Sequence, residues 1–205
     1  MLRSNHWKNL TKEAWKSEII ARGYDITGTL KFVNGRTINR SLADQIVRHF
    51  FHKSDRILFG RAADKKIGID RLCFVEYGED GQNLHIQFSA KSVIDQEFFC
   101  CFLNALWTQM HTETAPLMKN WITPIQDIER SASYNTKEVR NFRESDLGLL
   151  VSHVNDADIN LASFDTMAQI RRTLAHISYN DYISATKAYS YQLAQIKAKL
   201  AQSGK

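Results

Sequence analysis

The stretch that decides the fold is residues 71–88, RLCFVEYGEDGQNLHIQF. Its two ends, 71–77 and 84–88, are rich in β-branched, aromatic and other apolar residues, and the sequence GEDG at 78–81 is typical of a turn. The pattern predicts an antiparallel hairpin. Because successive strand residues point to opposite faces, His85 and Gln87 share one face, and Leu84, Ile86 and Phe88 share the other. The hairpin therefore presents two polar side chains on one sheet surface.

The segments on either side of the hairpin alternate between strand and helix patterns. Upstream, the residues indicate a helix over 5–22, a strand over 24–33, a helix capped by Ser41 and a loop over 61–66. Downstream, they indicate a helix over 94–110, a strand over 121–124 and a polar helix from about 127 to 142. This order predicts an α+β fold with a ferredoxin-like antiparallel sheet and helices packed on it.

Length and composition favour one domain with a small appendage. A chain of 205 residues with 43% hydrophobic residues can bury one good core. We expect a domain over 1–157, with its core at about 24–142, and a basic C-terminal helical extension over 158–205. An apolar stripe in this extension packs on the chain's own core or pairs with another subunit; it consists of Tyr189, Leu193, Ile196 and Leu200.

The charge and the cysteine pattern limit the class of partner. A net charge of +5 and a pI near 9.1 favour a polyanion such as nucleic acid. No apolar run approaches the roughly 18 residues of a spanning helix, and the N-terminus shows no signal-peptide pattern. Cys73, Cys100 and Cys101 form no Cys-x-x-Cys pair. We therefore expect a cytoplasmic protein without a membrane partner, whose cysteines are buried small hydrophobic residues.

The polar face of the hairpin is a candidate metal site. Glu76 lies on the strand that pairs with the His85 strand, so its carboxylate is expected beside the imidazole. An imidazole nitrogen, the Gln87 amide oxygen and a carboxylate suit Mn²⁺ or Mg²⁺ better than the thiolate-rich sites of zinc. The alternative is a half-solvated sheet face, on which these residues are only the polar half of an alternation.

A second candidate site lies in the predicted polar helix, where Tyr134 and Lys137 are three residues apart and share a face. A tyrosine can attack a phosphodiester and keep the bond energy in a covalent phosphotyrosine link. Since a phenol has a pKa of about 10, the attack needs a metal that polarises the phosphate and a cation near the phenol. Lys137 could supply this cation. The alternative is an ordinary pair on a helix surface.

Five basic side chains, from the end of the second predicted helix to the start of the hairpin, are candidate phosphate contacts. They are Arg56, Arg61, Lys65, Lys66 and Arg71. The alternative is a solvated charged face.

Taken in chain order, these segments resemble the HUH endonucleases, in particular the rolling-circle replication initiators. Residues 25–32, DITGTLKF, resemble the first motif, His85-Ile-Gln87 is similar to the glutamine variant of the second, and Tyr134-Asn-Thr-Lys137 matches the third. Glu76, ahead of a glycine turn, is similar to the acidic residue that precedes the metal strand in circovirus-type initiators. The resemblance covers roughly residues 24–142.

The resemblance implies a metal-dependent endonuclease that nicks and rejoins single-stranded DNA through a covalent phosphotyrosine, and so initiates rolling-circle replication. It implies His85, Gln87 and Glu76 as ligands of Mn²⁺ or Mg²⁺, Tyr134 as the nucleophile, and Lys137 as the residue that positions or polarises the phosphate. The expected substrate is single-stranded or hairpin origin DNA. No ATPase phosphate-binding loop occurs in this sequence, which makes a host helicase a candidate partner.

Two other functions are compatible with the same residues. A transposase or a mobilisation relaxase uses the same nick, covalent hold and strand transfer. A non-catalytic, basic α+β module would grip nucleic acid on its sheet, with His85 and Tyr134 as ordinary surface or stacking residues.

Overall fold

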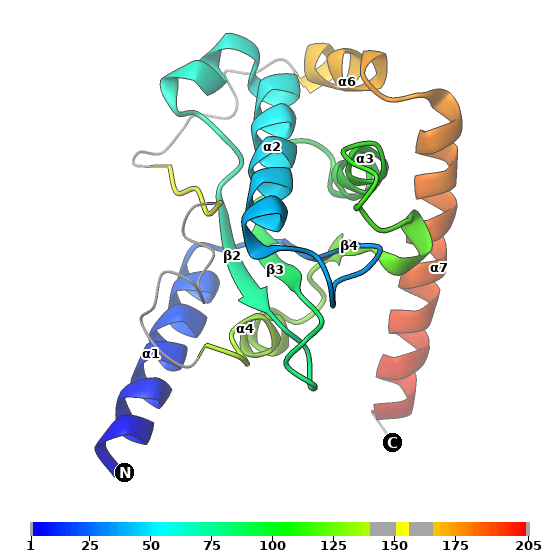
Figure 1. Ribbon diagram of the computed structural model, residues 1–205. Helices are drawn as coiled ribbons and strands as arrows, with labels where there is room; N and C mark the ends of the chain where they lie inside the picture. Colours follow the sequence, from blue (N-terminus) through cyan, green and yellow to red (C-terminus); the bar gives the residue numbers. More distant parts are fainter. Residues whose placement is uncertain (1, 140–150, 156–165, 204–205) are drawn as a thin grey trace.

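A four-stranded antiparallel sheet forms the centre of the molecule in the computed structural model, which describes residues 2–139, 151–155 and 166–203 (Figure 1). The strands are β1 (Ile26–Lys31), β2 (Arg71–Glu76), β3 (His85–Ala90) and β4 (Trp121–Pro124), in the spatial order β2-β3-β1-β4. With α2 (Arg40–Phe59) between β1 and β2, and α3 (Gln96–Thr108) between β3 and β4, the chain has the βαββαβ order of a ferredoxin-like fold. The predicted fold class is confirmed.

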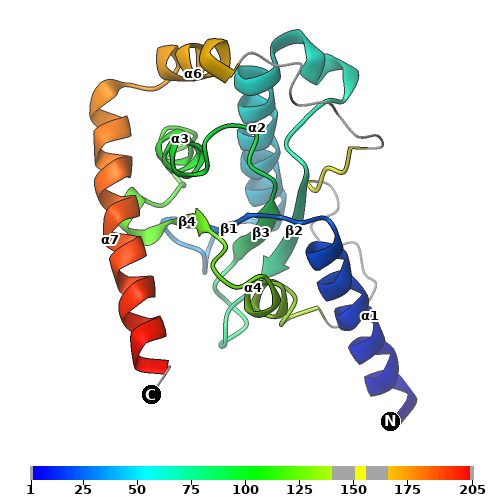
Figure 2. The ribbon, with the colours of Figure 1, turned by 180° about the vertical axis from the view of Figure 1, so that it is seen from behind.

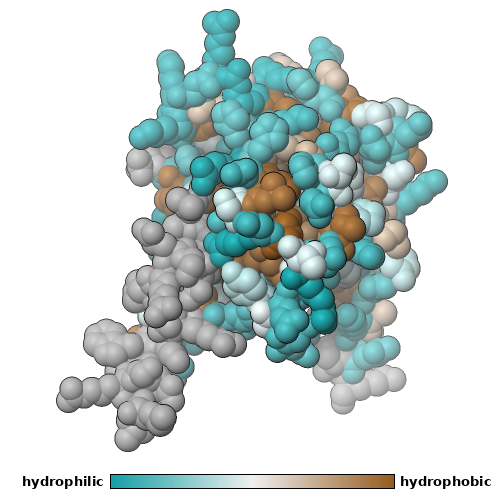
Figure 3. Space-filling view, viewed as in Figure 1, coloured by the Kyte–Doolittle hydropathy of each residue, from teal (hydrophilic) through white to brown (hydrophobic). Residues whose placement is uncertain are grey.

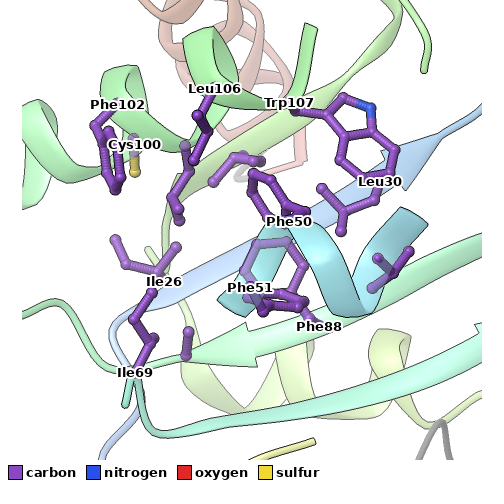
Figure 4. Packing of buried hydrophobic residues seen from close by; sticks show 14 of the residues in the cluster. Ile26, Leu30, Phe50, Phe51, Ile69, Phe88, Cys100, Phe102, Leu106 and Trp107 are labelled. Atoms are coloured by element: carbon purple, nitrogen blue, oxygen red, sulfur yellow. The ribbon is translucent and has the colours of Figure 1, made fainter. Parts of the chain in front are cut away.

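One face of the sheet carries the main hydrophobic core, beneath α2 and α3. Figure 4 shows the aromatic rings of Phe50 and Phe51 between the sheet and Trp107 of α3. The Phe50 and Trp107 rings meet edge to face with their centres 5.2 Å apart, a favourable geometry for aromatic pairs. Gly28 lets β1 pack closely, because a Cβ there would lie 2.3 Å from Cε1 of Phe88. Ile26, Leu30 and Phe32 of this strand and its end join the core.

The opposite face of the sheet is only partly apolar. At its β2 side Leu72 and Phe74 pack against α1 (Leu2–Ala21) and α4 (Ile128–Asn135), with Ile19 and Ala132 in the same cluster. Towards β1 and β4 this face is more polar, because Thr27, Thr29 and Thr123 lie on it, beside Trp121. The polar half of this face is where the predicted site residues lie.

The C-terminal segment completes the main core. Helix α6 (Thr166–Ala175) packs on α2, while α7 (Tyr179–Ser203) packs on α3 and passes β4 (Figures 1 and 2). Ile177, Ala185 and Tyr189 belong to the main core cluster, and Leu193 packs against it. The part of the expected extension that the structure describes, residues 166–203, is therefore mainly helical, and its two helices pack on the core.

Three local predictions are corrected. Asn39, not Ser41, caps α2: its side chain accepts a hydrogen bond from the Ser41 backbone N–H at 2.7 Å. The expected loop over 61–66 forms a 3₁₀ helix, η1 (Gly60–Lys65); a second one is η2 (Leu117–Lys119).

The polar helix is shorter than expected and ends at Asn135, where the Thr136 hydroxyl donates to the Ala132 carbonyl and closes the last turn. Positions 140–142 of that expected helix lie outside the described residues.

Hydrophilic residues predominate on the face shown in Figure 3, with a small hydrophobic area near its centre. Of the helices that the structure describes, none combines the length and apolar character needed to cross a membrane.

Candidate active site

The site is built on a row of three residues that lie side by side across the sheet. In the strand register His85 of β3 is opposite Glu76 of β2 on one side and opposite Lys31 of β1 on the other. Directly paired residues of an antiparallel sheet project to the same face. The hairpin predicted from residues 71–88 therefore brings the carboxylate beside the imidazole, as expected.

The His85 ring is held in one orientation. Its Nδ1–H donates to the backbone carbonyl of Asn83 at 2.7 Å, and its Nε2 lies 3.3 Å from Oε1 of Glu76. With Nδ1 protonated, Nε2 either donates a second proton to Glu76 or presents a lone pair to it. A lone pair and a carboxylate that face each other are the donors a cation needs, and a backbone carbonyl on the far nitrogen is the usual support for a metal-binding histidine.

Lys137 forms a triad of side chains with Glu76 and His85. Its Nζ lies 2.5 Å from Oε1 of Glu76, whose side chain is only 5% exposed. Burial raises the pKa of Glu76, but the hydrogen bonds and charges of His85 and Lys137 outweigh burial and hold the pKa below its usual value. For Lys137, burial lowers the pKa, and the interactions with Glu76 and Tyr134 raise it to a net value above the usual one. Both groups are thus charged at neutral pH.

Tyr134 stands at the edge of the same site. It lies on the last turn of α4 with 52% of its surface exposed, and Lys137 Nζ sits 4.0 Å from the centre of its ring. The sequence predicts Lys137 on the helix, but Lys137 lies in the turn that follows it. There its backbone N–H donates to the Tyr134 carbonyl at 3.2 Å. The pair meets nevertheless, and Lys137 bridges the phenol ring and the Glu76 carboxylate.

Gln87 extends the site along β3, two residues from His85 and on the same face. It is buried, and its Oε1 accepts a hydrogen bond from the Thr29 hydroxyl at 2.7 Å. An amide oxygen has a second lone pair that can bind a cation. Within the described residues no three His, Cys, Asp or Glu side chains form a metal cluster. A metal here would therefore use His85, Glu76, the Gln87 amide oxygen and water, a set that suits Mg²⁺ or Mn²⁺.

Helix α4 is fixed to the sheet by one buried side chain beside Tyr134. Asn135 Nδ2 donates to the Ser89 hydroxyl at 2.8 Å, the Thr27 hydroxyl at 3.1 Å and the Phe88 carbonyl at 3.3 Å. These bonds join the helix to both β1 and β3. The position of the Tyr134 ring over the sheet therefore depends on Asn135.

The predicted phosphate contacts are not brought to this site, and Arg71 is a correction. Arg71 is 7% exposed; its guanidinium pairs with Asp55 at 3.1 Å and lies over the Phe51 ring at 4.3 Å. It is a buried structural cation that cannot reach a phosphate in this arrangement. Arg56 is paired with Asp64 on the surface. The exposed Arg61, Lys65 and Lys66 lie on or next to η1, at the end of the sheet where β2 begins, whereas Glu76 is where β2 ends (Figure 1).

Sequence reasoning did not single out Thr29, Lys31 or Asn135 as site residues. The alternation in residues 25–32 was a usable signal for two of them, since it places Thr29 and Lys31 on the face opposite the core. Only the strand register shows that they lie beside Gln87 and His85. Asn135 carries no signal of its own in the sequence.

Comparison of the chain with protein-family models, with curated proteins and with solved structures finds no match in any of the three.

Proposed function

We propose that this protein is a metal-dependent single-strand DNA endonuclease that nicks and rejoins DNA through a covalent phosphotyrosine at Tyr134, as a rolling-circle replication initiator does. One observation carries the proposal: Lys137 Nζ contacts both Glu76 Oε1, at 2.5 Å, and the Tyr134 ring, at 4.0 Å. Lys137 thus joins Tyr134 and Glu76, which are 58 positions apart in the chain (134 − 76 = 58). The proposed nucleophile, a cation and two proposed metal donors thus share one site.

The chemistry assigns a separate task to each side chain. The Tyr134 oxygen attacks the phosphorus, so that one P–O bond forms to tyrosine and the bond to the leaving sugar oxygen breaks. The phenolic proton is released, and the leaving oxygen takes up a proton. Lys137 stabilises negative charge on the phenol and on the phosphate. The reverse reaction, with a sugar hydroxyl as nucleophile, rejoins the strand and frees Tyr134 without ATP.

His85, Glu76 and Gln87 would hold Mn²⁺ or Mg²⁺. Such an ion would polarise the phosphate and neutralise the charge that develops on its oxygens. Two features suit a divalent metal ion. The His85 ring is fixed through its Nδ1, and one carboxyl oxygen of Glu76 faces its Nε2. Lys137 lies between Glu76 and the phenol ring, where its ammonium group can meet the phosphate.

The test is incubation with Mn²⁺ and a random pool of single-stranded oligonucleotides, followed by denaturing electrophoresis. We expect a covalent protein–DNA adduct that is lost with a chelator, with Tyr134→Phe and with His85→Ala. Tyr179→Phe is the matched control, since Tyr179 is 76% exposed and lies on α7, outside the site. Sequencing of the trapped strand would give the target.

An adduct that persists in Tyr134→Phe would contradict the assignment of the nucleophile. Binding of the pool without any adduct, also when the pool is replaced by hairpin DNA, would favour the non-catalytic nucleic-acid-binding module. Neither result depends on the identity of the replicon.

A further inference from the structure

A groove opens next to Tyr134 on the polar half of the sheet face. It has a volume of about 240 Å³ and runs between β1, β3 and β4 below and α4 at one side. Gln87 and Tyr134 both line it, so it continues directly from the candidate active site. Ligand pockets for drug-sized molecules measure roughly 300–1,000 Å³, which makes this groove suitable for one small flat group.

The second wall of the groove comes from the C-terminal helix. Ile196 and Lys199 of α7 line it, although they are more than 60 residues beyond Tyr134 in the sequence (196 − 134 = 62). The helix is held there because Gln192, one turn earlier, donates to the Asn120 carbonyl at 2.6 Å, just before β4. Figure 2 shows α7 passing β4 on its way to the C-terminus.

The chemistry of the lining fits a nucleobase with its phosphates. Two aromatic residues, Trp121 and Tyr134, and the apolar Ile196 offer surfaces for stacking. Arg130 and Lys199, two exposed cations, also line the groove and can contact the phosphates.

The polar groups of the lining point to the same ligand. The single carboxylate among the lining residues, Asp127, is used as the N-cap of α4 and accepts from the Arg130 N–H at 3.0 Å. Thr27, Thr29 and Gln87 also line the groove and bring hydrogen-bonding groups to the edge of a base.

We propose that this groove is a nucleotide subsite: it holds one base of single-stranded DNA next to the phosphate that Tyr134 attacks, and α7 forms one of its walls. The subsite rests on the proposed function, and it deepens that function by assigning the C-terminal helix a direct role in substrate binding.

The test measures binding without cleavage. Tyr134→Phe protein in chelator is titrated with a fluorescent random single-stranded pool, followed by anisotropy. Adding Lys199→Ala should weaken binding about threefold to tenfold and lower the slope of log affinity against log salt by about 0.7, the value for one lost phosphate contact on a single strand. Lys197→Ala is the matched control, because Lys197 is also exposed on α7 but does not line the groove.

A second pair of variants tests the base. Ile196→Glu should weaken binding about tenfold or more, because it places a carboxylate in the groove; Tyr191→Glu adds the same charge on the exposed part of α7 and should leave binding within about twofold. A strand of abasic residues keeps the phosphates and removes the bases. It should bind more weakly than the pool, and Ile196→Ser should reduce that difference. Thermal melting of each variant identifies loss of folding, and the milder Ile196→Ser keeps the test valid if Ile196→Glu does not fold.

Equal binding by the groove variants and their controls would overturn the subsite, as would equal affinity for the abasic strand. An adduct at Tyr134 together with unchanged binding in Ile196→Glu would leave the nicking function in place and remove the subsite. Groove-dependent binding without any adduct would support the subsite and remove the nicking function. Failure to bind single-stranded DNA at all would remove both.

Discussion

Glu76 is the residue that ties the candidate site together. Its Oε1 contacts Lys137 Nζ at 2.5 Å and His85 Nε2 at 3.3 Å, so one buried carboxylate oxygen serves two positive or potentially positive groups. A carboxylate this buried is costly unless it is paired, which explains why both partners face it.

The low pKa of Glu76 predicts a pH-dependent contribution to stability. Its pKa is lower in the folded protein than the roughly 4.3 of an unfolded glutamate, so the contribution is present above about pH 4.3 and is lost as the pH falls through the folded value. Lys137→Met should therefore lower the free energy of unfolding by about 1 kcal/mol at neutral pH, a modest value because Lys137 is 36% exposed. Urea unfolding in chelator at neutral and acidic pH measures this.

Lys119→Met is the control for that experiment, because Lys119 is an exposed lysine outside the site. A difference between Lys137→Met and the wild type that is as large at acidic pH as at neutral pH would show that the Glu76 charge is not its cause.

At the scale of elements, the site depends on how α4 is attached to the sheet. The helix has only eight residues, Ile128–Asn135, and a helix of this length is marginal without tertiary contacts. Asn135 supplies three hydrogen bonds from its last turn to β1 and β3. Tyr134 and Lys137 flank this anchor on either side, so the anchor orients both.

Asn135→Ala should loosen that attachment. The Ser89 and Thr27 hydroxyls would lose a buried partner, and we expect a loss of about 1–3 kcal/mol in the free energy of unfolding. Adduct formation should fall further than the stability loss explains, while Mn²⁺ affinity, measured by calorimetry, changes little. Glu129→Gln, an exposed change on the same helix, is the control. Unaltered adduct formation in Asn135→Ala would show that the nucleophile does not need this anchor.

A second element contact joins α2 to β2 through the buried ion pair of Asp55 and Arg71. Their side chains are 11% and 8% exposed, and Asp55 also accepts from the Ile69 N–H at 2.8 Å. Arg71→Met should cost about 3–5 kcal/mol, because it leaves a buried carboxylate without its cation, and adding Asp55→Asn should restore part of the loss. Arg56→Met removes an exposed pair and should cost less than about 1 kcal/mol. Equal losses in urea unfolding would contradict the buried role of Arg71.

For the whole molecule, the core extends over nearly the full described chain. Residues as far apart as Ile26 and Tyr189 belong to one cluster, and the C-terminal helices cover α2 and α3. The segment expected as an appendage therefore contributes to the same core. The sheet separates this core from the polar face that carries the site.

The three cysteines report on this core. All are buried, and burial raises the pKa of Cys73 to about 12 and the pKa values of Cys100 and Cys101 above the ordinary range. Since the thiolate is the reactive form, none should react with Ellman's reagent at neutral pH in the native protein, and all three should react in denaturant. A thiol that reacts in the native state at the rate of a free cysteine would contradict this packing.

The sequence by itself determined the order of strands and helices and the face of β3 shared by His85 and Gln87. These properties depend on local periodicity and turn chemistry, which neighbouring residues encode. It also paired Tyr134 with Lys137, although through the wrong element. The Arg71 error has the same origin: charge is visible in a sequence, but burial opposite Asp55 is not.

Only the tertiary structure decided the rest. Strand register places Lys31 beside His85, Lys137 meets Glu76 across 61 positions of sequence (137 − 76 = 61), and α7 returns to form the wall of the groove beside Tyr134. Such contacts join residues with no sequence relation to one another, because they follow from how the elements pack and not from any local pattern.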